Sequence, residues 1–139
     1  MEPKGWADAL RVLSGSERKT LLTLAERVVR QAVKASRRQD LYPLAILSSV
    51  LRELAQPLDA LRVTEDYCDK GYAPILTSRS AAYCDLQQYD EAVALIVQAW
   101  DVCRRDPGDK SHAWRVIKRI RSEAKRYPEL LKQLPRWTD

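Results

Sequence analysis

Shifted by 32 positions, the middle of this 139-residue sequence matches itself. The aligned pairs are Leu44 with Leu76, Ser48 with Ser80, Leu51 with Tyr83, Leu54 with Leu86, Asp59 with Glu91, Ala60 with Ala92 and Leu61 with Val93. At an offset of 31, Pro43 also meets Pro74. A period in the thirties is typical of helical repeats, in which one hairpin of two helices cannot bury its apolar face without a neighbour.

Glycine and proline fall between stretches whose apolar residues recur at steps of three and four, the spacing of one face of a helix. The 4 Gly and 7 Pro are too few for the turns of a β-sandwich or barrel. The pattern therefore predicts an all-α fold. We expect helices near residues 6–13, 16–36, 42–55, 57–69, 74–87, 89–105 and 111–127, with a short turn near 129–134.

The second copy of the repeat alternates small and large residues at positions expected to face neighbouring helices: Ser80, Tyr83, Tyr89, Ala92, Ile96 and Ala99. This segment resembles a tetratricopeptide repeat (TPR). The resemblance implies an α-solenoid, a right-handed stack of antiparallel helix hairpins closed by a C-terminal capping helix. Residues 44–67 resemble a degenerate copy, in which Pro57 and Leu58 stand in the turn.

The chain is predicted to be a single TPR-like domain over residues 1–139. Residues 1–38 would form N-terminal helices, residues 39–105 two repeat hairpins, and residues 108–139 a basic capping helix and tail. The sequence departs from the family at Gln87, where glycine is typical, and at Pro107, which arrives late and predicts an extended second helix. A different helical repeat of similar hairpin design remains an alternative.

Charge is segregated along the chain, although the net charge is only +5. Residues 1–38 hold nine Lys and Arg against four Asp and Glu, residues 39–103 hold four against ten, and residues 104–139 hold eleven against five. The two ends are therefore basic and the centre is acidic. Such a pattern suggests surfaces with opposite preferences and makes head-to-tail self-association a geometric option.

The expected helix 111–127 carries a basic strip: Arg115, Lys118, Arg119, Arg121, Lys125 and Arg126. Three interpretations remain open, namely a solvated outer face, a contact for an acidic protein partner, and a contact for nucleic-acid phosphates. No motif for reading bases accompanies the strip, so nucleic-acid binding would be nonspecific.

In the TPR family the first helix of each hairpin lines the concave surface. The resemblance therefore implies that a partner would contact Ser49, Arg52, Ser78, Arg79 and Asp85, although each could also be an ordinary exposed residue. The lysine and asparagine of the family's chaperone-binding clamp are absent from these helices.

The sequence offers no constellation typical of an enzyme, so we expect no catalytic residues, no cofactor and no metal site. An enzyme remains a third hypothesis, which would gain support if His112 lay near a carboxylate inside a pocket. His112 is the only histidine and has no motif around it, and no Gly-rich loop suggests a phosphate site. The three cysteines, Cys68, Cys84 and Cys103, are widely spaced and are expected to behave as small apolar residues.

The sequence predicts a cytoplasmic protein without a membrane partner, since no stretch has the length and apolarity of a membrane span or a secretory signal. The leading hypothesis is a scaffold or adaptor that binds another protein or peptide through its concave helices, its basic C-terminal helix, or both. The alternative is an accessory nucleic-acid-binding protein that uses helix 111–127.

Overall fold

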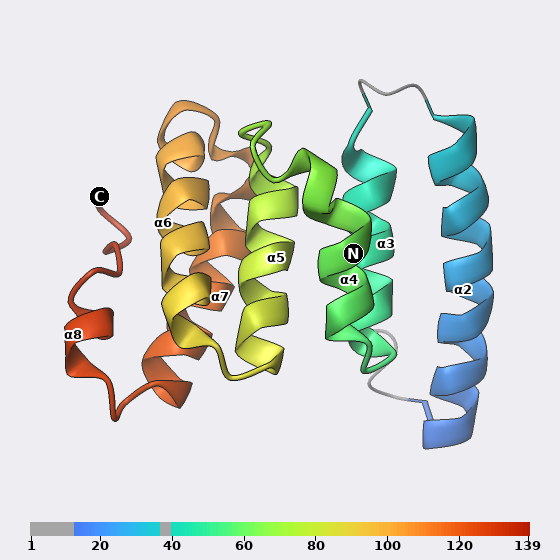
Figure 1. Ribbon diagram of the computed structural model, residues 1–139, viewed down its shortest axis with the longest axis horizontal. Coiled ribbons are helices and arrows are strands. Elements are labelled where there is room, and N and C mark those ends of the chain that lie inside the picture. The colour runs from blue at the N-terminus through green and yellow to red at the C-terminus, as the bar shows by residue number, and fades with distance from the viewer. Residues whose placement is uncertain (1–12, 37–39) are drawn as a thin grey trace, which may run out of the picture.

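A computed structural model describes residues 13–36 and 40–139, and within these residues all regular structure is helical (Figure 1). The prediction of an all-α fold is confirmed. In chain order the elements are α2 (Gly15–Ala35), α3 (Tyr42–Glu53), α4 (Pro57–Thr64), the 3₁₀ turn η1 (Glu65–Tyr67), α5 (Ala73–Asp85), α6 (Tyr89–Arg105), the 3₁₀ turn η2 (Pro107–Asp109), α7 (Lys110–Glu123) and α8 (Pro128–Leu131).

The helices predicted within the described residues are found, and the largest differences are at the C-terminal ends of two of them. The expected helix 57–69 ends at Thr64 and continues as a 3₁₀ turn, whereas α6 extends to Arg105 as the late proline predicted. The helix expected over 111–127 ends at Glu123. Pro128 disfavours the α-helical conformation of the residue before it, Tyr127, so the helix must end before Tyr127. The helix expected near 6–13 falls almost entirely outside the described residues.

Helix α5 holds the centre of the molecule. It contacts α3 and α4 on one side and α6 and α7 on the other. Figure 1 shows this central position, with α2 at one end of the row of helices and α8 at the other. Helix α2 packs against α3, and its residue Arg18 forms an ion pair with Glu53 of α3.

The turns that follow α3 and α5 share one geometry. Ala55 and Gln87, which lie 32 positions apart, have φ values of 60° and 59°. After α3, the amides of Ala55 and Gln56 donate to the carbonyls of Arg52 and Leu51, both at 2.9 Å. After α5, the amides of residues 87 and 88 donate to the carbonyls of residues 84 and 83 at the same distances. Both turns are Schellman motifs built on a left-handed residue, so the sequence offset of 32 is also an offset in backbone structure.

Small residues lie at equivalent crossings in the two helix pairs. Ala60 on α4 and Ala92 on α6 are both fully buried, as the repeat predicted for positions of close helix approach. At the α5–α6 crossing the Ser80 hydroxyl donates to the Ala92 carbonyl at 2.6 Å, so the hydroxyl is satisfied although Ser80 is buried.

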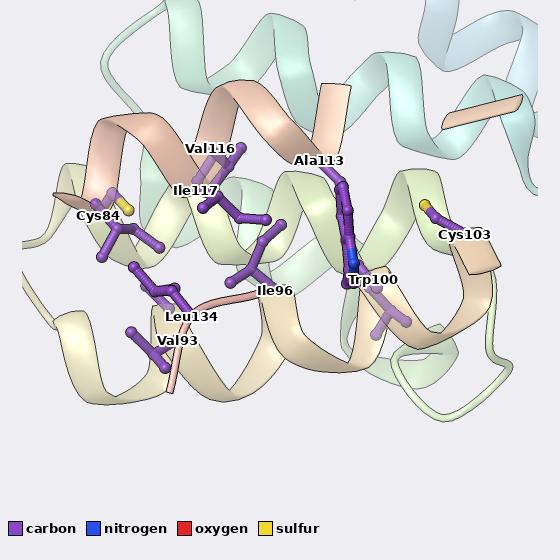
Figure 2. Close-up of a cluster of buried hydrophobic side chains, with 14 of the residues drawn as sticks. Cys84, Val93, Ile96, Trp100, Cys103, Ala113, Val116, Ile117 and Leu134 are labelled. Carbon is purple, nitrogen blue, oxygen red and sulfur yellow. The ribbon is translucent and has the colours of Figure 1, made fainter. Parts of the chain in front are cut away.

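The largest hydrophobic cluster lies between α5, α6, α7 and the C-terminal segment (Figure 2). Trp100 is buried within it, and its ring lies 5.8 Å from that of half-buried Trp114 and 6.0 Å from that of Trp137. Trp137 is 45% exposed and covers this end of the cluster together with buried Leu134. The C-terminal tail therefore seals the last hydrophobic layer.

Among the described residues, every helix is too short or too polar to cross a lipid bilayer. Cys84 and Cys103 are buried in the large cluster, and their burial raises the pKa of each thiol to about 11. Both thiols are therefore protonated at neutral pH and act as small apolar side chains.

Candidate functional site

A groove of about 410 Å³ lies between α3, α5 and α7. The residues that line it recur at helical spacing on each of the three helices. From α3 they are Tyr42, Ala45, Ile46, Ser49 and Arg52, from α5 Pro74, Thr77, Ser78 and Ala81, and from η2 and α7 Asp109, His112, Arg115, Val116 and Arg119.

Small residues of α3 and α5 line the groove where these two helices meet. Ala45, Ser78 and Ala81 are buried, and Ser78 shares a 2.6 Å hydrogen bond with Ser48, a fully buried neighbour on α3. Ser49 donates to the carbonyl of Ala45 at 3.2 Å. The contact between α3 and α5 is thus made by short side chains, which leave the space above them open.

At one end of the groove, an aspartate joins two arginines from different helices. Arg52 of α3 donates from Nε to Asp85 Oδ2 at 2.8 Å and from Nη2 to Asp85 Oδ1 at 3.2 Å. Arg119 of α7 donates from Nη1 to the same Oδ1 at 2.8 Å. All three side chains are at least two-thirds buried, so solvent screens these pairs less than it screens ordinary surface pairs. The bridge ties α3, α5 and α7 together.

The network of hydrogen bonds extends from Arg119 through Glu123 of α7 to α6. Arg119 also donates from Nε to Glu123 Oε2 at 2.7 Å, and the Tyr89 hydroxyl of α6 donates to Glu123 Oε1 at 3.0 Å. Burial is the largest single influence on the pKa of the Arg119 guanidinium and lowers it, but the hydrogen bonds that Arg119 donates to Glu123 and Asp85, with the negative charge of Asp85, outweigh burial and leave the pKa raised.

At the other end of the groove, Asp109 receives two hydrogen bonds. Thr77 of α5 donates to Oδ2 at 3.1 Å, and His112 Nδ1 lies 3.0 Å from Oδ1. The hydrogen bond to Asp109 raises the pKa of His112 above its ordinary value, and partial burial opposes this rise. The imidazolium form of His112 is therefore favoured beside the groove.

The partner-binding residues predicted from the sequence divide into two groups. Ser49, Arg52 and Ser78 line the groove, and Asp85 binds the arginines at its end. Arg79 does not reach the groove. It is buried between α4 and α5, where Nη1 donates to the Leu61 carbonyl at 2.8 Å and to Thr64 Oγ1 at 2.9 Å.

The physical reason is helix geometry. Each residue of a helix is rotated about 100° from the one before it, so the groove-lining residues of α5, from Pro74 to Ala81, share one face and Arg79 points about 150° away from the centre of that face. Arg79 instead places its positive charge at the C-terminal end of α4, where the last carbonyls lack helical partners. Its expected contact with a partner is therefore replaced by a structural one.

The predicted basic strip is not continuous. Lys125 and Arg126 lie beyond the end of α7. Arg121 faces the tail, donating from Nη2 to the Pro135 carbonyl at 2.7 Å with its guanidinium carbon 5.3 Å from the Trp114 ring. Arg119 is held by the bridge. Arg115 and Lys118 are the exposed cations of α7, and neither has an ion pair within the described parts of the chain.

Several groove residues were not identified as site candidates from the sequence, most notably Tyr42, Asp109 and His112. Their signal was present, because Tyr42 precedes Ser49 by two helical turns and His112 precedes Arg119 by the same spacing. That spacing becomes informative only when α3, α5 and α7 are known to lie side by side.

Comparison with known proteins yields no significant match to a family model, a curated protein or a solved structure. The interpretation of this site therefore depends on its own geometry and charges.

Proposed function

We propose that this chain is a TPR-like scaffold that binds a segment of another protein in the groove between α3, α5 and α7. In this proposal α3 with α4 and α5 with α6 are antiparallel hairpins of a right-handed stack, and α7 is the capping helix. The two Schellman turns at an offset of 32 support the stack, as does the central position of α5 between the two pairs.

The observation that carries the proposal is the composition of the groove. Its residues come from three helices far apart in the sequence, and short side chains meet along part of its length. Tyr42 and Arg52 are ten positions apart on α3, which corresponds to about 15 Å along a helix axis. An extended peptide rises about 3.3 Å per residue, so the groove has room for a segment of about four or five residues.

Blocking the groove tests this function. Ser49 is half-buried and lies on the groove wall, so Ser49→Trp should fill the space without replacing a core residue. Gln98 is exposed on α6 and does not line the groove, which makes Gln98→Trp a matched control. Peptides would be selected from a random display library on the wild-type chain and then titrated against both variants.

We expect the selected peptides to bind the wild-type chain and Gln98→Trp equally and to lose at least about tenfold in affinity with Ser49→Trp, because the indole occupies their space. Circular dichroism and thermal melting would show that both variants fold. A library that yields no binder, or binders that ignore Ser49→Trp, would refute the proposal.

A second candidate function is nonspecific nucleic-acid binding, and the exposed cations Arg115 and Lys118 of α7 favour it. Cations that neutralise phosphates release counterions, so affinity must fall as salt rises. A gel-shift titration with a single-stranded oligonucleotide at several salt concentrations tests this candidate. Affinity that is independent of salt, or unchanged in the double variant Arg115→Glu, Lys118→Glu, would exclude phosphate binding by α7.

A further inference from the structure

The charges of the groove are unequally satisfied. Every oxygen of its two aspartates already accepts at least one hydrogen bond: Asp85 receives Arg52 on one oxygen and both Arg52 and Arg119 on the other, and Asp109 receives Thr77 on one oxygen and His112 on the other. A basic ligand would have to compete with donors that each carboxylate oxygen already has.

The cations of the groove retain free donors. A guanidinium has five N–H groups. Arg52 donates to Asp85 from Nε and Nη2, which leaves Nη1 available. Arg115 lines the groove, is exposed, and has no carboxylate partner within residues 13–36 and 40–139. His112, one turn before Arg115, adds a cation when protonated. Arg52 and Arg119 share Asp85, and Arg119 also pairs with Glu123, so Arg115 is the arginine of the groove whose charge no carboxylate of the described residues offsets.

We infer that the groove binds an acidic segment of a partner protein, an inference that rests on the proposed function. In this segment acidic and aliphatic residues alternate, and a glutamate or aspartate pairs with Arg115. An Arg–carboxylate pair is frequently bidentate, which gives geometric specificity as well as energy. The aliphatic residues match the apolar part of the groove lining, which includes half-buried Ile46 of α3 and the exposed edge of Val116, the residue after Arg115. In an extended peptide, successive side chains point to opposite faces.

The hydroxyls of the groove suit the backbone of such a segment. Ser49 donates its proton to Ala45, and Thr77 donates its proton to Asp109. A hydroxyl that donates still has acceptor lone pairs, so both oxygens can accept a peptide N–H. The groove then has acceptors for the peptide backbone and cationic donors for its acidic side chain.

The inference is tested by fluorescence anisotropy with a fluorescein-labelled peptide in which glutamate alternates with leucine. Two matched peptides carry glutamine or lysine in place of glutamate. The protein variants are Arg115→Glu and Lys118→Glu, which reverse one exposed charge each on the same helix, although only Arg115 lines the groove. Arg115→Gln repeats the test without charge reversal, and circular dichroism verifies folding.

We expect the glutamate peptide to bind the wild-type chain at least about tenfold more tightly than the glutamine peptide, the loss typical of one charge-assisted contact. Arg115→Glu and Arg115→Gln should each weaken the glutamate peptide by about tenfold or more, whereas Lys118→Glu should change its affinity less than about threefold because that charge is screened. The lysine peptide should bind most weakly.

Other results overturn the inference in distinguishable ways. Equal losses in Arg115→Glu and Lys118→Glu would show attraction to general basic charge and not recognition in the groove. Equal affinity for the glutamate and glutamine peptides, with both blocked by Ser49→Trp, would leave the groove as a docking site but remove its acidic preference. Self-association in sedimentation equilibrium that Arg115→Glu abolishes would make a second copy of this chain the occupant.

Discussion

The two helix pairs, α3 with α4 and α5 with α6, share a turn but differ in how they are stabilised. The second pair has a long partner helix, Tyr89–Arg105, buried in the largest hydrophobic cluster. The first pair has a short one, Pro57–Thr64, with a smaller cluster. Arg79 of α5 reaches across to the carbonyl end of α4. An internal repeat thus preserves the turn and the close crossing, while packing outside them is free to diverge.

Overpacking the crossings should give the largest effect and should separate the two pairs. Ala92→Leu adds three carbons at a fully buried site where the α5–α6 contact is held by a 2.6 Å hydrogen bond, so we expect a loss of about 3 kcal/mol. Ala60→Leu should cost about 1 kcal/mol, since α4 ends four residues later and can shift. Urea denaturation measures both.

The exposed Ala94 of α6 provides the control, and Ala94→Leu should change stability by less than about 0.5 kcal/mol. A larger loss for Ala60→Leu than for Ala92→Leu would contradict the view that the first pair is the more adaptable of the two.

Removing the Arg79 side chain should damage the first pair selectively. Arg79→Ala removes the guanidinium donor of the Leu61 carbonyl, which keeps a 3.2 Å contact with the Thr64 hydroxyl, and it also removes the donor to that hydroxyl, so we expect a loss of about 2 kcal/mol. The position 32 residues later is Ser111, which is exposed, and Ser111→Ala should have little effect. Hydrogen exchange should show lost amide protection in α4 and retained protection in α6. Uniform loss in both helices would mean that the pairs unfold as one unit.

Arg79 also shows which features could be predicted from the sequence. Helices, their order and the small-residue crossings depend on local spacing, and the structure agrees with them at Ala60 and Ala92. The role of Arg79 depends on α4 ending at Thr64, which no local signal near residue 79 reveals. The groove shows the same division. Ser49 and Arg52 follow from the face of α3, whereas Asp109 and His112 reach the groove only because α7 packs against α5.

The two turns should respond equally to glycine, which tests their equivalence more finely. Ala55 and Gln87 both have φ near 60°, a conformation that costs a non-glycine residue roughly 1–2 kcal/mol. Glycine removes that strain but adds conformational entropy to the unfolded chain. We expect Ala55→Gly and Gln87→Gly each to stabilise the protein by about 0.5–1 kcal/mol in urea denaturation. Stabilisation by only one of them would show that the turns differ in strain despite their matching hydrogen bonds.

The smallest effect should come from pH and should be confined to the side of the molecule that contains α7. The chain has one histidine, His112, and its hydrogen bond to Asp109 raises its pKa above 6.5 in the folded state. A raised pKa stabilises the fold fully below the unfolded value, and this contribution disappears as the pH rises through the folded value. The stability difference between the wild-type chain and His112→Gln should therefore be larger at pH 5.5 than at pH 8. Because the His112 side chain is 68% exposed, solvent screening should keep the change below about 1 kcal/mol. A difference that grows towards pH 8 would mean that the neutral imidazole, and not the imidazolium, is the form that the folded state prefers.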